Sequence, residues 1–354
     1  MNCPDPVRTT ISQWQPTELP PGLHTFEVDL NEQSDDLALT WHAFVVRGEA
    51  DGPVLLVTAG VHGDEYEGMV GIRAFVNDLQ PSMLRGTVIA IPVVHAAAYE
   101  AAQRCSPLDD CDLARTFPGC PDGTPSQRVA YALSRYVLSL ADFFCDLHAA
   151  GMHYEIVKLT GYMVGPPDSA VKQYGACVAY GLPLIWATPT APGRSLTAAR
   201  DLDVPAIYVE YGGGGACPQA DTQQCRRALR RLAAYLDMVD GDYPTQFSGT
   251  FVQDTTDGAG HLQLQGVAEA SGFLEPRVAL WQSVQRGQVL AEICDPLGRV
   301  VDTCRADRSG RIVLLRRTRY VRAGECCCSV MGKVEGRKMT NDGMTNDERM
   351  SKSE

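Results

Sequence analysis

Two uniformly apolar runs with a helix-like segment between them constrain the fold most. The apolar runs lie at residues 53–59 and 87–94, and the segment between them begins at Glu65. Its apolar residues recur with helical spacing, whereas both flanking runs are apolar at nearly every position. Strands buried on both faces have such sequences, because helices cover both sides of the sheet. The unit predicts a strand, a helix and a strand of an α/β domain.

The same alternation of strand-like and helix-like segments extends along the chain. Two half-buried strands at residues 23–30 and 39–48 are expected to open the fold, because their apolar residues alternate with polar ones. Later strands are predicted at residues 142–148, 160–164, 183–187 and 205–210, with helices near 126–140, 168–180 and 218–239. We therefore predict one α/β domain over residues 20–245.

The C-terminal part of the chain has a different texture. Residues 250–332 consist of short alternating stretches interrupted by glycines, without a helix-length pattern. This texture predicts a small all-β domain. Residues 335–354 are charged and polar, and they offer too little apolar surface to stay ordered, so we expect a disordered tail there.

Charge and the N-terminal sequence narrow the partners and the location. The formal net charge is -12 and the pI is near 5.1, which disfavours nucleic acid and anionic membranes as partners, since both attract basic proteins. The first residues lack a basic segment followed by an apolar one, and no apolar run reaches the length of a membrane helix. We expect a cytoplasmic protein with a small-molecule partner and no membrane partner. The sequence leaves a homo-oligomer open.

His62 and Glu65 stand three residues apart where a predicted strand gives way to a predicted helix. In a turn or a first helical turn, this spacing lets both side chains face one point. Imidazole nitrogen and carboxylate oxygen are both good zinc ligands, and a catalytic zinc site needs three protein ligands. The alternative is a surface histidine beside a carboxylate that the helix dipole favours.

His148 is the best-placed third ligand, because it closes the predicted strand 142–148. Alternation along that strand places Asp146 and His148 on one face and Cys145 on the other, which argues against a Cys145–His148 metal site. Asp146 is then expected to orient a histidine ligand from behind. The alternatives for Asp146 are a helix N-terminus or a partner for an arginine.

Glu210 ends another apolar strand, 205–210, and glycines follow at residues 212–215. A carboxylate at the end of a buried strand, beside a loop that allows close backbone approach, is a candidate general base. The alternative is an exposed carboxylate above a flexible turn.

Taken together, these segments resemble the succinylglutamate desuccinylase/aspartoacylase family of zinc carboxypeptidase-like (M14) proteins. The resemblance rests on four short segments in the family's order: residues 60–65, 112–119, 146–148 and 209–213. It implies a mixed, mostly parallel sheet flanked by helices, and a small C-terminal β domain that narrows the mouth of the active site. It also implies one zinc per chain, bound by His62, Glu65 and His148, with Glu210 as catalytic base and acid.

One departure from the family's pattern concerns substrate binding. The family has Asn before an arginine, and both bind a substrate carboxylate, whereas this chain has Ala114 before Arg115. Arg115 can still bind a carboxylate with both guanidinium nitrogens, but the acyl group is left open. A second substrate arginine is expected among Arg104, Arg194 and Arg200.

The resemblance implies hydrolysis of a small N-acyl amino acid. The stretch at residues 63–68 looks most like family members that deacetylate N-acetyl-diaminobutyrate. Two alternatives stay open: a metallocarboxypeptidase that acts on peptides, and a non-catalytic binding protein whose β domain docks partners. A β domain that crowds the cleft argues against the first, and the lack of a lysine in a hairpin turn argues against a lipoyl-type carrier.

Overall fold

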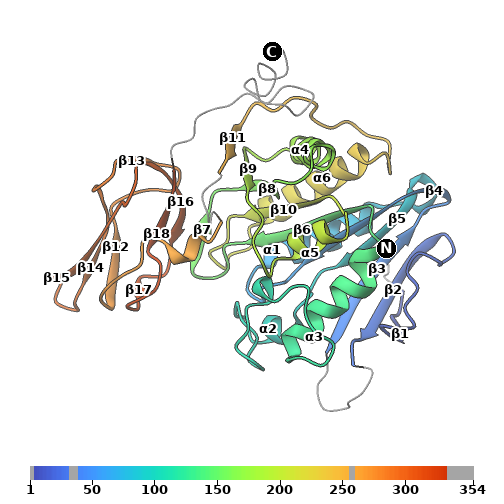
Figure 1. The fold of residues 1–354 in the computed structure, drawn as a ribbon, viewed down its shortest axis with the longest axis horizontal. Coiled ribbons are helices and arrows are strands. Elements are labelled where there is room, and N and C mark those ends of the chain that lie inside the picture. The colour runs from blue at the N-terminus through green and yellow to red at the C-terminus, as the bar shows by residue number, and fades with distance from the viewer. Residues whose placement is uncertain (1–3, 32–38, 255–259, 333–354) are drawn as a thin grey trace.

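A ten-stranded sheet forms the body of the protein (Figure 1). The computed structural model describes residues 4–31, 39–254 and 260–332. The strand order across the sheet is β1-β2-β3-β5-β4-β6-β10-β8-β9-β11. The strands are β1 (Val7–Thr10), β2 (Gly22–Asp29), β3 (Thr40–Arg47), β4 (Ala50–Ala59), β5 (Arg85–Ile91), β6 (Phe143–Ala149), β8 (Leu159–Met163), β9 (Leu184–Thr188), β10 (Ala206–Tyr211) and β11 (Thr250–Gln253).

Parallel pairing dominates this sheet, as predicted. The strands β5, β4, β6 and β10 are successively parallel, and so are β8, β9 and β11. Antiparallel pairs join β2 to β3, β3 to β5 and β10 to β8. The predicted mixed, mostly parallel sheet is therefore confirmed.

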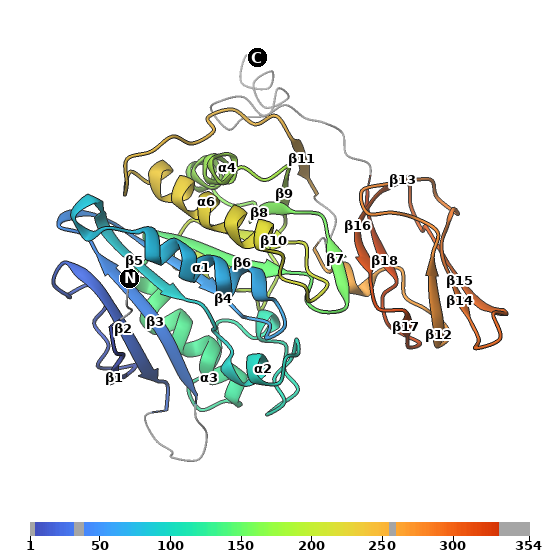
Figure 2. The same ribbon diagram turned by 180° about the vertical axis from the view of Figure 1, so that it is seen from behind.

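Helices cover both faces of the sheet (Figures 1 and 2). One face carries α1, α4 and α6, which pack against a core of side chains from β4, β5, β6 and β10. The opposite face carries α3 and α5 over a second core. The helices are α1 (Tyr66–Asp78), α2 (Ala96–Glu100), α3 (Pro125–Ala132), α4 (Pro167–Tyr180), α5 (Ser195–Asp201) and α6 (Gln219–Tyr235).

Two smaller sheets form the C-terminal β region. One has the order β15-β14-β12-β17, and the other has the order β13-β16-β18. Their strands are β12 (Gly272–Pro276), β13 (Ser283–Val284), β14 (Val289–Cys294), β15 (Val300–Arg305), β16 (Gly310–Arg316), β17 (Tyr320–Val321) and β18 (Cys328–Gly332). They enclose a separate apolar core, with antiparallel pairs throughout.

Strand pairing links the two regions across the predicted boundary. Strand β7 (Tyr154–Ile156), from the middle of the chain, pairs with β16, and β11 joins the large sheet beside β9. The division into residues 20–245 and 250–332 stays a prediction, and the predicted tail at 335–354 lies outside the described residues. Within the described ranges, no helix has the length and apolar character needed to cross a membrane.

Candidate metal centre and active site

The carboxyl ends of three adjacent strands bring the predicted site residues together. β4, β6 and β10 are neighbours and run parallel, so their ends meet at one edge of the sheet. His62 and Glu65 lie in the turn between β4 and α1, and His148 lies near the end of β6. Glu210, near the end of β10, is the register partner of His148.

His62, Glu65 and His148 form a compact set of metal-ligand atoms. One donor atom from each residue lies within 4.8 Å of the others. The Nδ1 atoms of both histidines face the same carboxylate, at 2.7 Å from Glu65 Oε1 for His62 and at 3.0 Å from Glu65 Oε2 for His148. Glu65 is buried, at 3% exposure. Two imidazole nitrogens and a carboxylate arranged around one point could hold a metal ion.

The charges of the three side chains are strongly coupled. Burial opposes ionisation of Glu65, but His62 and His148 together lower the pKa of its carboxyl well below the usual range. Burial likewise opposes a charge on His148, yet Asp146 and Glu65 raise the pKa of its imidazole. The cluster therefore favours an ionised carboxylate, which is the form of the side chain that binds metal.

Asp146 contacts His148 from behind, on the side away from Glu65. Its Oδ2 lies 3.2 Å from His148 Nε2, while Thr58 Oγ1 donates to its Oδ1 at 2.7 Å. Ser195 Oγ also donates to Oδ2. Asp146 is fully buried, so these contacts fix its orientation. This placement supports the predicted role of orienting a histidine ligand.

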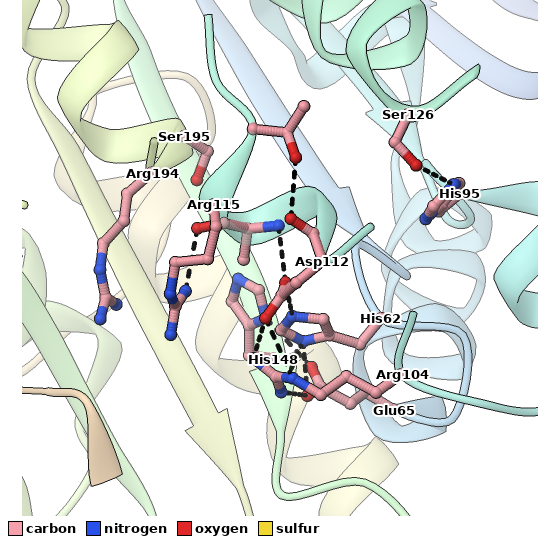
Figure 3. Close-up of polar contacts among 12 residues, drawn as sticks. His62, Glu65, His95, Arg104, Asp112, Arg115, Ser126, His148, Arg194 and Ser195 are labelled. Atoms are coloured by element: carbon pink, nitrogen blue, oxygen red, sulfur yellow. Dashed lines mark hydrogen bonds and ion pairs between the residues drawn. The ribbon is translucent and has the colours of Figure 1, made fainter. Parts of the chain in front are cut away.

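Asp112 makes the equivalent contact with His62, which sequence analysis missed. Its Oδ1 lies 3.0 Å from His62 Nε2, and Arg104 Nη2 donates to its Oδ2 at 3.0 Å. Burial opposes ionisation of Asp112, but His62 and Arg104 lower the pKa of its carboxyl below the usual range. Figure 3 shows these side chains converging on Glu65. Each histidine thus has Glu65 at Nδ1 and an aspartate at Nε2.

A cavity of about 230 Å³ extends from this cluster and contains two further arginines. Arg115 and Arg194 line it beside Arg104 (Figure 3). In the described part of the chain, neither Arg115 nor Arg194 forms an ion pair with a carboxylate. Arg200 instead pairs with Asp201 at 2.7 Å and does not line the cavity.

The two unpaired arginines lie close enough to affect each other. Loss of hydration and the positive charge of Arg194 lower the pKa of Arg115 to about 10. Arg194 Nη2 donates to the Gly260 carbonyl at 3.2 Å, whereas its Nε is buried without a partner among the described groups. Two adjacent guanidiniums that make no ion pair with a carboxylate in the described part of the chain can bind an anion, although Asp112 and Glu210 partly offset their charge.

Glu210 lines the same cavity as the metal-ligand cluster and the arginines. Burial raises the pKa of its carboxyl above the usual value, with a further contribution from Glu65, while His148 lowers it. The opposite wall comes from the β region, through residues 260–264 and Leu314. The C-terminal region therefore encloses part of the cavity.

Two further carboxylates of the same turn anchor the loops that follow β6 and β10. Asp64 Oδ2 accepts from the Met152 amide at 2.9 Å, and Glu67 Oε1 accepts from the Gly213 amide at 3.1 Å. Gly213 has φ +89°, and a Cβ there would lie 2.8 Å from Ala150 Cβ, so only glycine fits. Sequence analysis predicted neither anchor, because both join segments distant along the chain.

Comparison with known proteins places the site in a family context. The model of the succinylglutamate desuccinylase/aspartoacylase catalytic domain matches residues 51–236, more than half of the chain. An N-alpha-acetyl-L-2,4-diaminobutyric acid deacetylase of Halomonas elongata is 26% identical over 337 residues, covering 94% of this chain and 96% of that protein.

Solved structures agree on the fold. A succinylglutamate desuccinylase from Silicibacter sp. TM1040 is 25% identical, with a TM-score of 0.77 over 88% of this chain and 96% of that chain. The product-bound ectoine utilization protein EutE (DoeB) of Ruegeria pomeroyi has a TM-score of 0.78 over 89% of this chain and 98% of that chain. Its identity is 24%, so this second likeness concerns the fold alone.

Proposed function

The chain belongs to the succinylglutamate desuccinylase/aspartoacylase family, and from this premise we propose that it is a zinc-dependent amidohydrolase of small N-acyl amino acids. The observation that carries the proposal is the position of two unpaired arginines in the same cavity as a His-Glu-His cluster. One end of the cavity suits a metal that activates an amide, and the other suits the carboxylate of an amino acid.

The donor set of the cluster fits zinc. His62, Glu65 and His148 supply two imidazoles and one carboxylate, which is a known composition of catalytic zinc sites. The contacts of Asp112 and Asp146 leave both Nδ1 atoms directed toward Glu65. The chemistry that zinc supplies at such a site is Lewis acidity, which makes water a stronger nucleophile and polarises an amide carbonyl.

Glu210 is proposed as the group that moves the proton. Its carboxylate takes a proton from the attacking water as the water oxygen bonds to the carbonyl carbon. The same proton then passes to the amide nitrogen, the carbon–nitrogen bond breaks, and an amine and a carboxylic acid are formed. The acid then gives its proton to the amine, so that an ammonium and a carboxylate leave. The raised pKa of Glu210 suits both steps, because such a group can accept a proton and return it near neutral pH.

The arginines are proposed to divide the remaining work. Arg104 Nη1 lies 3.7 Å from Glu65 Oε1, so its guanidinium is beside the reacting carbonyl and can stabilise the oxyanion. Arg115 and Arg194 are farther along the cavity and are proposed to hold the amino-acid carboxylate. Arg194 is proposed as the second substrate arginine, because Arg200 pairs with Asp201 instead.

N-acetyl-diaminobutyrate is the first substrate to test. The relative from Halomonas elongata is a deacetylase of this compound, and the two sequences align over nearly their whole lengths. The volume of the cavity and its wall from the β region favour a small substrate over a peptide, which needs an open groove. This disfavours the metallocarboxypeptidase alternative.

Metal analysis combined with a substrate panel tests the proposal. We expect about one zinc per purified chain, and hydrolysis of N-acetyl-L-2,4-diaminobutyrate or of another N-acetyl, N-succinyl or N-formyl amino acid. Treatment with a chelator should abolish hydrolysis, and zinc should restore it. A zinc-loaded protein that hydrolyses no member of the panel would contradict the proposal.

A further inference from the structure

Tyr208 occupies a position on the cavity wall that the proposed reaction does not use. It lies two residues before Glu210 on β10, so both side chains point to the same face of the sheet. Both line the cavity. Among the described lining residues, Tyr208 carries the only ring apart from the imidazoles. Its side chain is therefore the only phenol ring that the described residues place on the cavity wall near Glu210.

The ring of Tyr208 is pressed against the backbone of the neighbouring strand. Tyr208 pairs with Gly161 in the antiparallel ladder between β10 and β8. A Cβ at Gly161 would lie 2.3 Å from both Cε1 and Cζ of the ring, and 2.5 Å from its hydroxyl oxygen. The Tyr208 ring therefore fits only because residue 161 is a glycine. Because backbone lies behind it, the ring cannot withdraw to enlarge the cavity.

Tyr208 also lines the same cavity as Arg194. Burial and the charge of Glu210 raise the pKa of its hydroxyl, and the charge of Arg194 opposes this rise. The phenol is thus within electrostatic reach of Arg194, one of the two guanidiniums without a carboxylate ion pair among the described residues. In the proposed binding mode, the amino-acid carboxylate binds these guanidiniums and the amino-acid side chain, rather than the acyl group, is directed toward Tyr208.

We propose that Tyr208 is the specificity-determining residue that restricts the amino-acid part of the substrate to a short side chain. The inference rests on the proposed function, since it assumes an N-acyl amino acid held by Arg115 and Arg194. Its physical basis is a ring that packs directly over Gly161 and lines the cavity that also contains Arg115 and Arg194. A longer amino-acid side chain in the substrate would overlap the Tyr208 ring. The scissile amide would then be displaced from Glu210.

Two substrate series with the Tyr208→Ala enzyme test this inference. In one series, N-acetyl amino acids extend from alanine and diaminobutyrate to phenylalanine; in the other, the acyl group on alanine grows from acetyl to hexanoyl. Tyr208→Ala should raise kcat/KM for the phenylalanine derivative relative to the alanine derivative by about tenfold or more. The acyl series should keep its wild-type ratios.

Conservative variants separate ring volume from other effects. Tyr208→Phe keeps the ring and should keep the wild-type preference in both series. Tyr162→Phe is the matched control, because Tyr162 is buried in the core on the other face of β8. Gly161→Ala should lower kcat/KM for longer amino acids in the wild type but not in the Tyr208→Ala background, since the clash needs the ring.

The outcomes separate failure of this inference from failure of the proposed function. A wild-type enzyme inactive on both series and on the N-succinyl and N-formyl amino acids of the panel would contradict the proposed function. An active wild type with unchanged ratios in Tyr208→Ala, at normal zinc content and melting temperature, would overturn the role of Tyr208 alone. A change confined to the acyl series, or an equal change in Tyr208→Phe, would also overturn it.

Discussion

The two ends of the cavity differ in how far the protein itself compensates their charges. At the metal end, Glu65 faces both histidines, and Asp112 and Asp146 contact the opposite sides of these rings. At the arginine end, Arg115 and Arg194 have no carboxylate partner among the described residues. A compensated cluster is ordered before any ligand arrives, whereas an uncompensated one gains most when an anion binds.

Substitutions at the two ends of the cavity should therefore have different consequences. Damage at the metal end should affect every substrate equally, because it removes the common chemistry. Damage at the arginine end should affect substrates according to their charge.

Replacing His62 or His148 by Ala should have the largest effect. We expect loss of both zinc and measurable hydrolysis, because neither remaining pair of ligands completes a three-ligand site. Elemental analysis and the acylase assay measure the two losses. His42→Ala, at an exposed position of β3, is the control and should keep both. Full zinc in either ligand variant would disprove the ligand assignment.

Replacing Glu210 by Gln should lower kcat by roughly 10²–10⁴-fold while zinc content stays normal. The change removes the group that accepts the proton but leaves the three ligands in place. KM should change little. Near-normal turnover would show that another group activates the water.

Arg115→Ala should produce a loss that depends on substrate charge. Arg115 is exposed in the free protein, and its proposed partner is the substrate carboxylate that would cover it. Removing one partner of such a covered charge pair costs about 2–5 kcal/mol, which corresponds to a loss of tens- to thousands-fold in kcat/KM for acyl-amino acids. Arg115→Lys keeps the charge but not the two-nitrogen geometry. Its kcat/KM should therefore lie between those of the wild type and Arg115→Ala. Arg200→Ala is the control, since Arg200 pairs with Asp201 away from the cavity.

Amides of the same substrates distinguish two roles for Arg115. If Arg115 holds the carboxylate, its substitution should lower kcat/KM far less for amidated substrates than for the acids. If Arg115 contacts the scissile carbonyl instead, its substitution should lower kcat/KM equally for acid and amide substrates. Substitutions at the two ends of the cavity would then not differ in their dependence on substrate charge.

Substitution of the aspartates behind the histidines should weaken zinc binding more modestly. Asp112→Asn and Asp146→Asn are each expected to lower zinc affinity by about 10–100-fold, because they remove the charge that orients a ligand ring. Competition with a chelator measures this change. Unaltered affinity in both variants would show that Glu65 alone fixes the two rings.

Sequence patterns could group His62 with Glu65, and Asp146 with His148, because each of these pairs lies within one turn or one strand. The contact between Glu65 and His148 spans 83 residues and could not be read from a local pattern. The spacing between His62 and Glu65, and the alternation that groups Asp146 with His148, are properties of a turn and a strand. The strands and helices of the α/β body follow from apolar periodicity for the same reason. Alternation along β10 could also have indicated Tyr208, which shares a face with Glu210.

The arginine end, and the contacts that join distant parts of the metal end, depend on packing that no local pattern records. Arg194 and Arg200 lie six residues apart, yet only the first lines the cavity, because α5 begins directly after it and directs Arg200 toward Asp201. Asp112 meets His62 across a separation of 50 residues. Contacts of this range arise only when the strand order brings distant loops together.

The smallest expected effect concerns Glu67, which joins the segment that carries Glu65 to the loop after Glu210. Its Oε1 accepts from the Gly213 amide at 3.1 Å, and Gly213 lies three residues beyond Glu210. A hydrogen bond of this kind contributes about 0.5–1.5 kcal/mol, so Glu67→Ala should lower kcat by about two- to tenfold through a less fixed base. KM and zinc content should stay unchanged, because no hydrogen bond or ion pair among the described residues joins the Glu67 side chain to the arginines or to the three ligands. Glu67→Gln retains an oxygen acceptor and should restore most of kcat. An equally impaired Gln variant would show that the charge, rather than the hydrogen bond, matters. A loss of zinc in Glu67→Ala would instead show that the loop after β10 supports the metal end directly.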